Sequence, residues 1–166
     1  MANYWTRARD REEVVAFKKW MYRGNRPNQF TKIINKGWAM LHALGIFPNY
    51  LVTLEVVGRQ SGKIISFPLV LTVLNGERYL VSMLGENTNW VRNIRAAQGN
   101  ARLLHGKSEQ VLLQEVEVSQ RAPVLKAFLQ HAPGARPHIP VSKNAPVSEF
   151  EIIASRYPVF RIKTTT

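Results

Sequence analysis

Cysteine is absent from all 166 residues of the chain. The absence excludes disulfides, thiolate ligands for a metal and a cysteine nucleophile. This composition fits a reducing compartment, so we expect a cytoplasmic protein. No apolar run is long enough to cross a bilayer, and the first residues lack the apolar centre of a secretory signal peptide.

Acidic residues are scarce, because 11 Asp and Glu stand against 23 Lys and Arg and leave a net charge of +12. A surplus of this size attracts phosphates, carboxylates, nucleic acid or an anionic membrane. The excess is concentrated between Arg7 and Lys36. It predicts an anionic ligand or partner, with a solvated basic surface as the ordinary alternative. We expect no nucleic-acid partner, since the sequence carries neither a recognition motif nor an aromatic stacking pattern.

Standard catalytic motifs are also missing from the sequence. The histidines lie far apart, without metal-ligand spacing or an acidic cluster, so we expect no metal site. A phosphate-binding loop of the G-x-x-x-x-G-K-[ST] type is absent. Ser61 follows Gly58 one place too late for the nucleophile of a G-x-S-x-G turn. An enzyme with this sequence therefore needs a bound cofactor to supply its chemistry.

Hydrophobic periodicity divides the chain near residue 50. Before it, apolar residues at helical spacing predict two helices, from Asp10 to Gly24 and from Phe30 to Gly45. After it, hairpin turns at Asn75-Gly76 and Gly106-Lys107 indicate paired strands. We expect strands over 51–57, 63–74, 79–83, 101–105, 110–118 and 159–162, and helices over 90–97, over 119–131 with Ser119 as the cap, and over 148–156.

Hairpins without βαβ alternation predict an α+β fold, a small antiparallel barrel with helices packed outside it. We expect a single domain, in which residues 1–49 form N-terminal helices on or beside a barrel of residues 50–166. The apolar stripe of the second helix has two interpretations. It is either packed in the core, or it lies on an anionic membrane surface while its lysines meet the headgroups.

Two segments are candidates for an anion site. In the first, Gly58 and Gly62 permit a sharp turn that exposes backbone N–H groups, and Arg59, Ser61 and Lys63 add donors. An ordinary basic hairpin turn is the alternative. The second segment, 89–95, opens a short helix whose free N–H groups favour anions, although its apolar residues are expected in the core.

The order of these motifs resembles the deazaflavin-dependent nitroreductase family. The similarity rests on Trp20-Met21-Tyr22-Arg23, Gly58-Arg59-x-Ser61-Gly62-Lys63, Pro68-Leu69, Arg78-Tyr79-Leu80-Val81 and Trp90-x-x-Asn93-Ile94-x-Ala96. It runs from about Trp20 to Gly106 and continues more weakly beyond.

The resemblance implies a split β-barrel like that of flavin-binding pyridoxamine-phosphate oxidases. It also implies a reduced deazaflavin coenzyme, F420, that passes hydride to a hydrophobic quinone-like or nitro acceptor; FMN is the less favoured cofactor. The implied cofactor-binding residues are Arg59, Gln60, Ser61, Gly62, Lys63, Ile65, Ser66, Pro68, Leu69, Val70, Ser82, Met83, Leu84, Gly85, Asn89, Trp90, Val91, Arg92 and Asn93. No side chain is assigned a catalytic role, because the coenzyme donates hydride and water supplies the proton.

Three positions depart from the family pattern. Gln60 and Ile65 stand where the family usually has a lysine and an arginine, and Glu86 replaces the second glycine of an expected Gly-Gly loop. Fewer cations and an added acid weaken the binding of an anionic coenzyme. The alternative function is therefore a non-catalytic barrel that binds a fatty acid or other lipid, associated with the inner face of a membrane. A homodimer is left open for either function.

Overall fold

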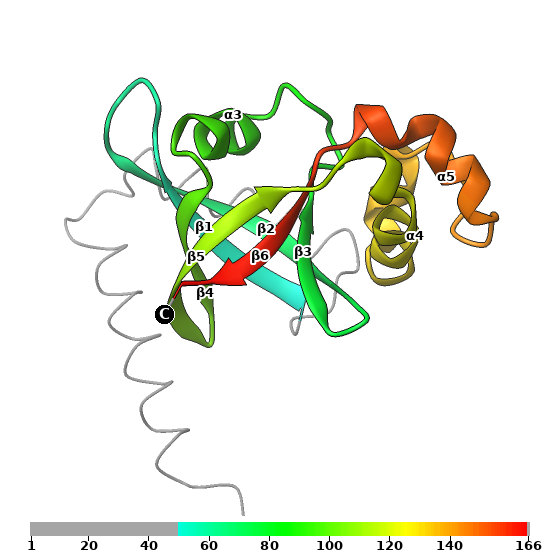
Figure 1. Ribbon diagram of the computed structural model, residues 1–166, viewed down its shortest axis with the longest axis horizontal. Helices are drawn as coiled ribbons and strands as arrows, with labels where there is room; N and C mark the ends of the chain where they lie inside the picture. Colours follow the sequence, from blue (N-terminus) through cyan, green and yellow to red (C-terminus); the bar gives the residue numbers. More distant parts are fainter. Residues whose placement is uncertain (1–49, 166) are drawn as a thin grey trace, which may run out of the picture.

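Six antiparallel strands form a closed barrel in the computed structural model, which describes residues 50–165 (Figure 1). Around the barrel the strand order is β1-β2-β3-β6-β5-β4, and every neighbouring pair is antiparallel. The strands are β1 (Leu51–Val57), β2 (Ile64–Leu74), β3 (Glu77–Val81), β4 (Asn100–His105), β5 (Lys107–Glu115) and β6 (Val159–Thr164). The predicted α+β barrel fold is confirmed.

The helices occupy two places around the barrel (Figure 1). Helix α3 (Asn89–Ala96) lies at one end, and α4 (Ala122–His131) and α5 (Val147–Ile153) lie together against one side. Short 3-10 turns precede and follow the last two helices: η2 (Val118–Gln120), η3 (Pro133–His138) and η4 (Ala154–Arg156). No helix of residues 50–165 combines the length and apolar character needed to span a membrane.

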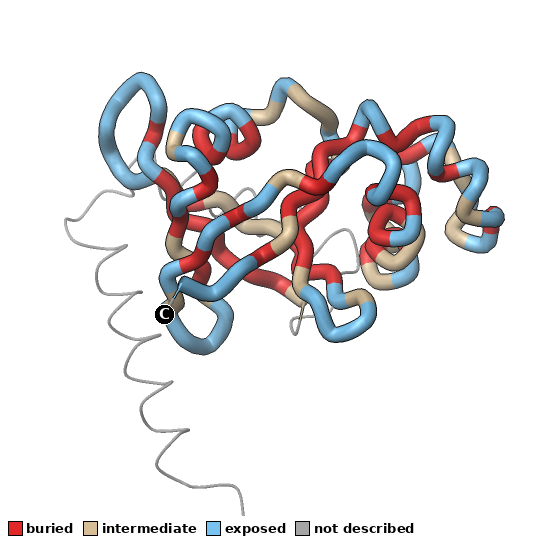
Figure 2. Tube along the Cα trace, in the orientation of Figure 1, coloured by how far each residue is buried: buried red, intermediate tan, exposed pale blue. Residues whose placement is uncertain are grey.

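Successive side chains of a strand point to opposite faces of the sheet, so the buried residues of a strand such as β1 contribute to two hydrophobic clusters. Figure 2 shows where buried residues lie along the chain. One cluster fills the barrel and takes in Val52, Leu54 and Phe160 from the strands and Trp90 and Ile94 from α3. The other lies between the outer face of the sheet and α4 and α5. Trp90 and Ile94 are thus core residues, as their helical spacing predicts.

Arg121 explains why α4 begins where it does. The predicted Ser119 cap is wrong: Ser119 lies in η2, and α4 starts at Ala122 after Arg121, with no side-chain cap. The Arg121 side chain is buried, and Nε donates to the carbonyl of Val116 at 2.8 Å. Nη1 donates more weakly to the carbonyls of Ala154 and Tyr157. This buried guanidinium fixes the chain before α4 by tertiary contacts that a local motif does not contain.

Two strand predictions are also displaced. The strand predicted over 110–118 occupies 107–115, because the turn at Gly106 is tight enough for His105 to pair with Lys107. The strand predicted over 79–83 occupies 77–81, since the Asn75-Gly76 turn lets Glu77 pair with Leu74 at once. The helices predicted before residue 49 lie outside the described residues.

Candidate functional site

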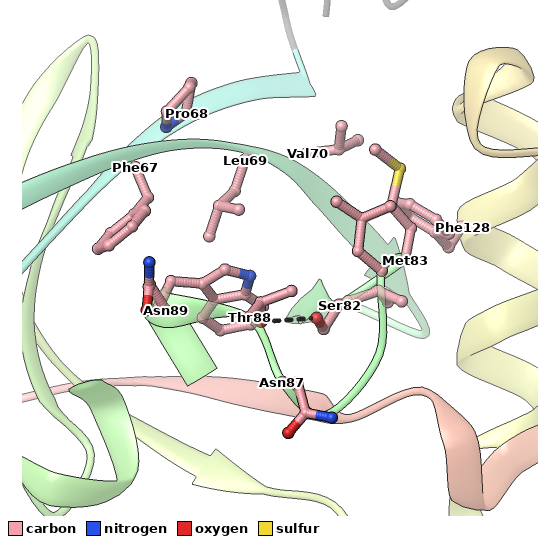
Figure 3. Close-up of a pocket in the computed structure, with 13 residues that line it drawn as sticks. Phe67, Pro68, Leu69, Val70, Ser82, Met83, Asn87, Thr88, Asn89 and Phe128 are labelled. Atoms are coloured by element: carbon pink, nitrogen blue, oxygen red, sulfur yellow. Dashed lines mark hydrogen bonds between the residues drawn. The ribbon is translucent and has the colours of Figure 1, made fainter. Parts of the chain in front are cut away.

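A pocket of about 480 Å³ lies between β2, the segment after β3 and the start of α3 (Figure 3). Phe67 and Asn89 stand at one end of it, and Met83 and Phe128 stand at the other. The lining residues are Phe67, Pro68, Leu69, Val70, Val81, Ser82, Met83, Leu84, Asn87, Thr88, Asn89, Trp90 and Phe128.

The lining is apolar apart from two hydroxyls and two amides. None of the thirteen residues is acidic, basic, histidine or tyrosine. A cavity of this volume and polarity suits a drug-sized organic ring, with a few polar groups to orient it. The pocket therefore fits a neutral, largely apolar group and provides no side chain that titrates near neutral pH.

Hydrogen bonds within the segment that follows β3 shape one wall of the pocket. Ser82 Oγ donates to the carbonyl of Gly85 at 2.7 Å and lies 3.1 Å from Thr88 Oγ1 (Figure 3). Gly85 has a φ of 86°, and a Cβ there would lie 3.2 Å from the carbonyl oxygen of Arg156. The positive φ favours glycine, and the missing Cβ lets this wall lie close to η4.

Glu86, which the sequence predicts to weaken the binding of an anion, is paired with an arginine. Its carboxylate accepts from Arg95 Nη1 at 2.6 Å, and Arg95 also donates to Glu115 at 2.6 and 2.9 Å. Glu115 in turn accepts from the buried Arg121 at 3.1 Å. The hydrogen bond from Arg95 lowers the pKa of Glu86, and hydrogen bonds to Glu115 and Glu86 raise the pKa of Arg95. The charge of Glu86 is therefore balanced by an arginine of the protein itself.

The loop between β1 and β2 lies against α3. Arg59 donates to Asn93 Oδ1 twice, from its backbone N at 3.3 Å and from Nη1 at 2.8 Å. The backbone N of Gly58 donates to the Lys63 carbonyl, and that of Gly62 donates to the Gly58 carbonyl. These two amides close the hairpin, so they do not serve the anion-binding role predicted for the loop's glycines.

The structure brings together part of the predicted site. Eight predicted residues line the pocket: Pro68, Leu69, Val70, Ser82, Met83, Leu84, Asn89 and Trp90. The others lie outside it: Arg59, Gln60, Ser61, Gly62, Lys63, Ile65, Ser66, Gly85, Val91, Arg92 and Asn93. Gln60 and Lys63 are exposed, and Ile65 covers Gly58. Ser66 reaches Glu55 on the outer face, and Val91 is buried in the barrel core.

The implied cofactor-binding residues leave out five residues that line the pocket. Phe67, Val81, Asn87 and Thr88 lie beside or between predicted positions, so a wider choice of the same segments would have included them. Phe128 carries no such signal, because a buried aromatic in a helix is typical of any core. Among the described residues, no three His, Asp or Glu side chains gather as a metal site would require.

Comparisons with known proteins give matches in structure alone. No protein-family model and no curated protein sequence matches the chain. A solved F420-H2 dependent reductase is 22% identical, covering 71% of this chain and 97% of that one, with a TM-score of 0.47.

Two further solved structures reach a TM-score of 0.50. A conserved hypothetical protein from Mycobacterium tuberculosis is 12% identical, covering 75% of this chain and 79% of that one, with a TM-score of 0.50. A protein of unknown function from Agrobacterium tumefaciens is 9% identical, covering 78% of this chain and 55% of that one, again with a TM-score of 0.50. What the comparisons establish for this chain is its barrel fold.

Proposed function

We propose that the chain is a deazaflavin-dependent oxidoreductase that transfers hydride from reduced coenzyme F420 to a hydrophobic quinone-like or nitro acceptor. The observation that carries the proposal is an apolar pocket of about 480 Å³ beside a basic loop. A ring with an anionic chain needs both parts, since its ring is apolar and its phosphate and carboxylates require cations.

The residues present suit such a ligand in two places. Phe67, Leu69 and Trp90 offer an apolar surface for the ring, and Asn87 and Asn89 offer amides at its polar edges. Arg59 of the β1–β2 loop lies toward the Asn89 end, because it is bonded to Asn93 one turn further along α3. The anionic chain would extend toward this loop.

When bound, the coenzyme supplies a hydride. The protein's own contribution is to bind and orient the two reactants, since no lining side chain is a general acid near neutral pH. The proton that completes reduction of a quinone comes from solvent. Catalysis therefore depends on pocket shape and placement rather than on a general acid.

A fluorescence titration with F420 tests the proposal, followed by turnover with menadione as the acceptor. We expect micromolar or tighter binding of F420 and weaker binding of FMN. Arg59→Ala should weaken F420 binding by about 1–3 kcal/mol, as expected for the loss of a hydrogen bond to a charged group. An unchanged affinity would place Arg59 outside the site.

A lipid-binding barrel is the second candidate, favoured by Leu84. This leucine lines the pocket and is 57% exposed, so an apolar chain leaving the pocket would stay in contact with it. The same titration with oleate separates the two functions. Clear oleate binding without F420 binding would establish the second candidate and reject the first.

A further inference from the structure

Two arginines near the pocket differ from the other hydrogen-bonded arginines of residues 50–165 in what they bond. Arg78, Arg95, Arg102 and Arg121 each reach a glutamate. Arg59 and Arg92 instead donate to the amide oxygens of Asn93 and Asn87. A carboxylate partner cancels the charge of a guanidinium, whereas an amide oxygen orients the guanidinium and leaves its charge intact.

Asn93 accepts two hydrogen bonds from its arginine and is the more buried of the two asparagines. Its side chain is 2% exposed, and Oδ1 accepts from both the backbone N and Nη1 of Arg59. Asn93 follows Asn89 by one helical turn, so the two lie on one face of α3. The arginine is therefore fixed beside the end of the pocket that Asn89 lines.

Asn87, in the segment between β3 and α3, likewise accepts a hydrogen bond from an arginine. It lines the pocket, and its Oδ1 accepts from Arg92 Nη2 at 2.7 Å. The sequence places no acid in 58–70 or 87–93. Glu86, the acid nearest to these segments in sequence, is bonded to Arg95. Within residues 50–165, Arg59 and Arg92 make their side-chain hydrogen bonds to amide oxygens and not to a carboxylate, so each can still pair with an anion of a ligand.

We propose that Asn93 and Asn87 are positioning residues that set the charge specificity of the site. They orient Arg59 and Arg92 without cancelling their positive charges. The two arginines then bind the anionic chain of a ligand whose ring lies in the pocket. This inference rests on the proposed function. An aspartate at either position could accept the same hydrogen bond but would supply the negative charge itself. The choice of amide over acid would thus select an anionic ligand.

The test compares Asn93→Asp and Asn87→Asp with a matched control, Asn75→Asp. Each variant adds one negative charge with almost no change of shape. Asn75 lies in the turn after β2, so the whole 11-residue strand, roughly 36 Å along its length at about 3.3 Å per residue, separates it from the β1–β2 loop. Affinity for F420 and for inorganic pyrophosphate is measured at low and high salt, and thermal stability is measured in parallel.

We expect Asn93→Asp to lower F420 affinity at least tenfold at low salt, with a shallower salt dependence and a melting temperature that is unchanged or higher. Asn87→Asp, on an exposed side chain that poses no folding risk, should lower it severalfold. Asn75→Asp should stay within twofold of the parent. The inference would be overturned if all three variants bind F420 as tightly as the parent, or if all three lose the same amount of affinity. If the parent does not bind F420 but binds pyrophosphate with this same pattern, the proposed function fails and the inference stands.

Discussion

At the scale of single residues, Arg78 and Glu109 link three strands. Arg78 on β3 forms a two-pronged pair with Glu109 on β5, with Nη2 and Oε2 3.0 Å apart, and Nη2 also donates to Thr164 on β6 at 3.0 Å. The hydrogen bond from Arg78 lowers the pKa of Glu109 below its ordinary value of 4.5. The pair therefore ties the folding free energy to pH.

We predict that the folding stability of the protein decreases as the pH falls below about 4.5. The decrease should be smaller in the Glu109→Gln variant than in the parent. A carboxyl whose pKa is lower in the folded state is protonated first in the unfolded chain, so its contribution is complete above the unfolded value and disappears as acid is added. Urea midpoints at pH 7 and pH 3.5 measure the effect. Parallel losses in the parent and the variant would show that this pair does not stabilise the fold.

At the scale of elements, the end of α3 depends on Gly99. Its φ is 84°, its N–H donates to the carbonyl of Ile94 at 2.9 Å, and a Cβ there would lie 2.4 Å from the carbonyl oxygen of Leu113. Leu113 in turn donates to the Gly99 carbonyl at 2.8 Å. The glycine thus ends the helix and lets the chain pass close to β5.

Gly99→Ala should destabilise the protein by about 2–4 kcal/mol, since the left-handed conformation costs roughly 1–2 kcal/mol and the backbone contact must also open. Gly106→Ala is the matched control. It has a φ of 70° but nothing within 4 Å of its Cβ, so only the conformational cost applies. Chemical denaturation compares the two, and equal losses would mean that the contact with Leu113 relaxes freely.

The sequence predicts an element well when neighbouring residues determine its bounds, and poorly when contacts with distant residues determine them. The bounds of β1 and the turn at Asn75-Gly76 follow from β-branched residues and a two-residue turn, and both agree with the structure. The start of α4 follows from buried contacts of Arg121 with distant carbonyls, so the Ser119 prediction failed. In the same way, Pro68 and Trp90 were predictable from motifs, but Phe128 reaches the pocket only through tertiary packing of α4.

At the scale of the whole molecule, the barrel is complete within residues 51–164. Among the residues that the structure describes, the six strands and every neighbouring pair of the closed barrel belong to this range. We therefore predict that a fragment of residues 50–166 unfolds in one cooperative transition, with the far-UV circular dichroism of a β-rich protein. A fragment without a cooperative transition would show that residues 1–49 belong to the same folding unit, against the predicted division at residue 49.

The position of β6 also has a consequence for how the protein is made. This strand pairs with β3 on one side and β5 on the other, so it closes a ring whose other five strands precede it in the chain. Synthesis proceeds at roughly 5–20 residues per second, and β3 and β5 each keep one unpaired edge until β6 has left the ribosome. Open edges are templates for pairing with other chains. The nascent chain is therefore most exposed to aggregation just before its last strand emerges, and the spacing between β5 and β6 sets how long that interval lasts.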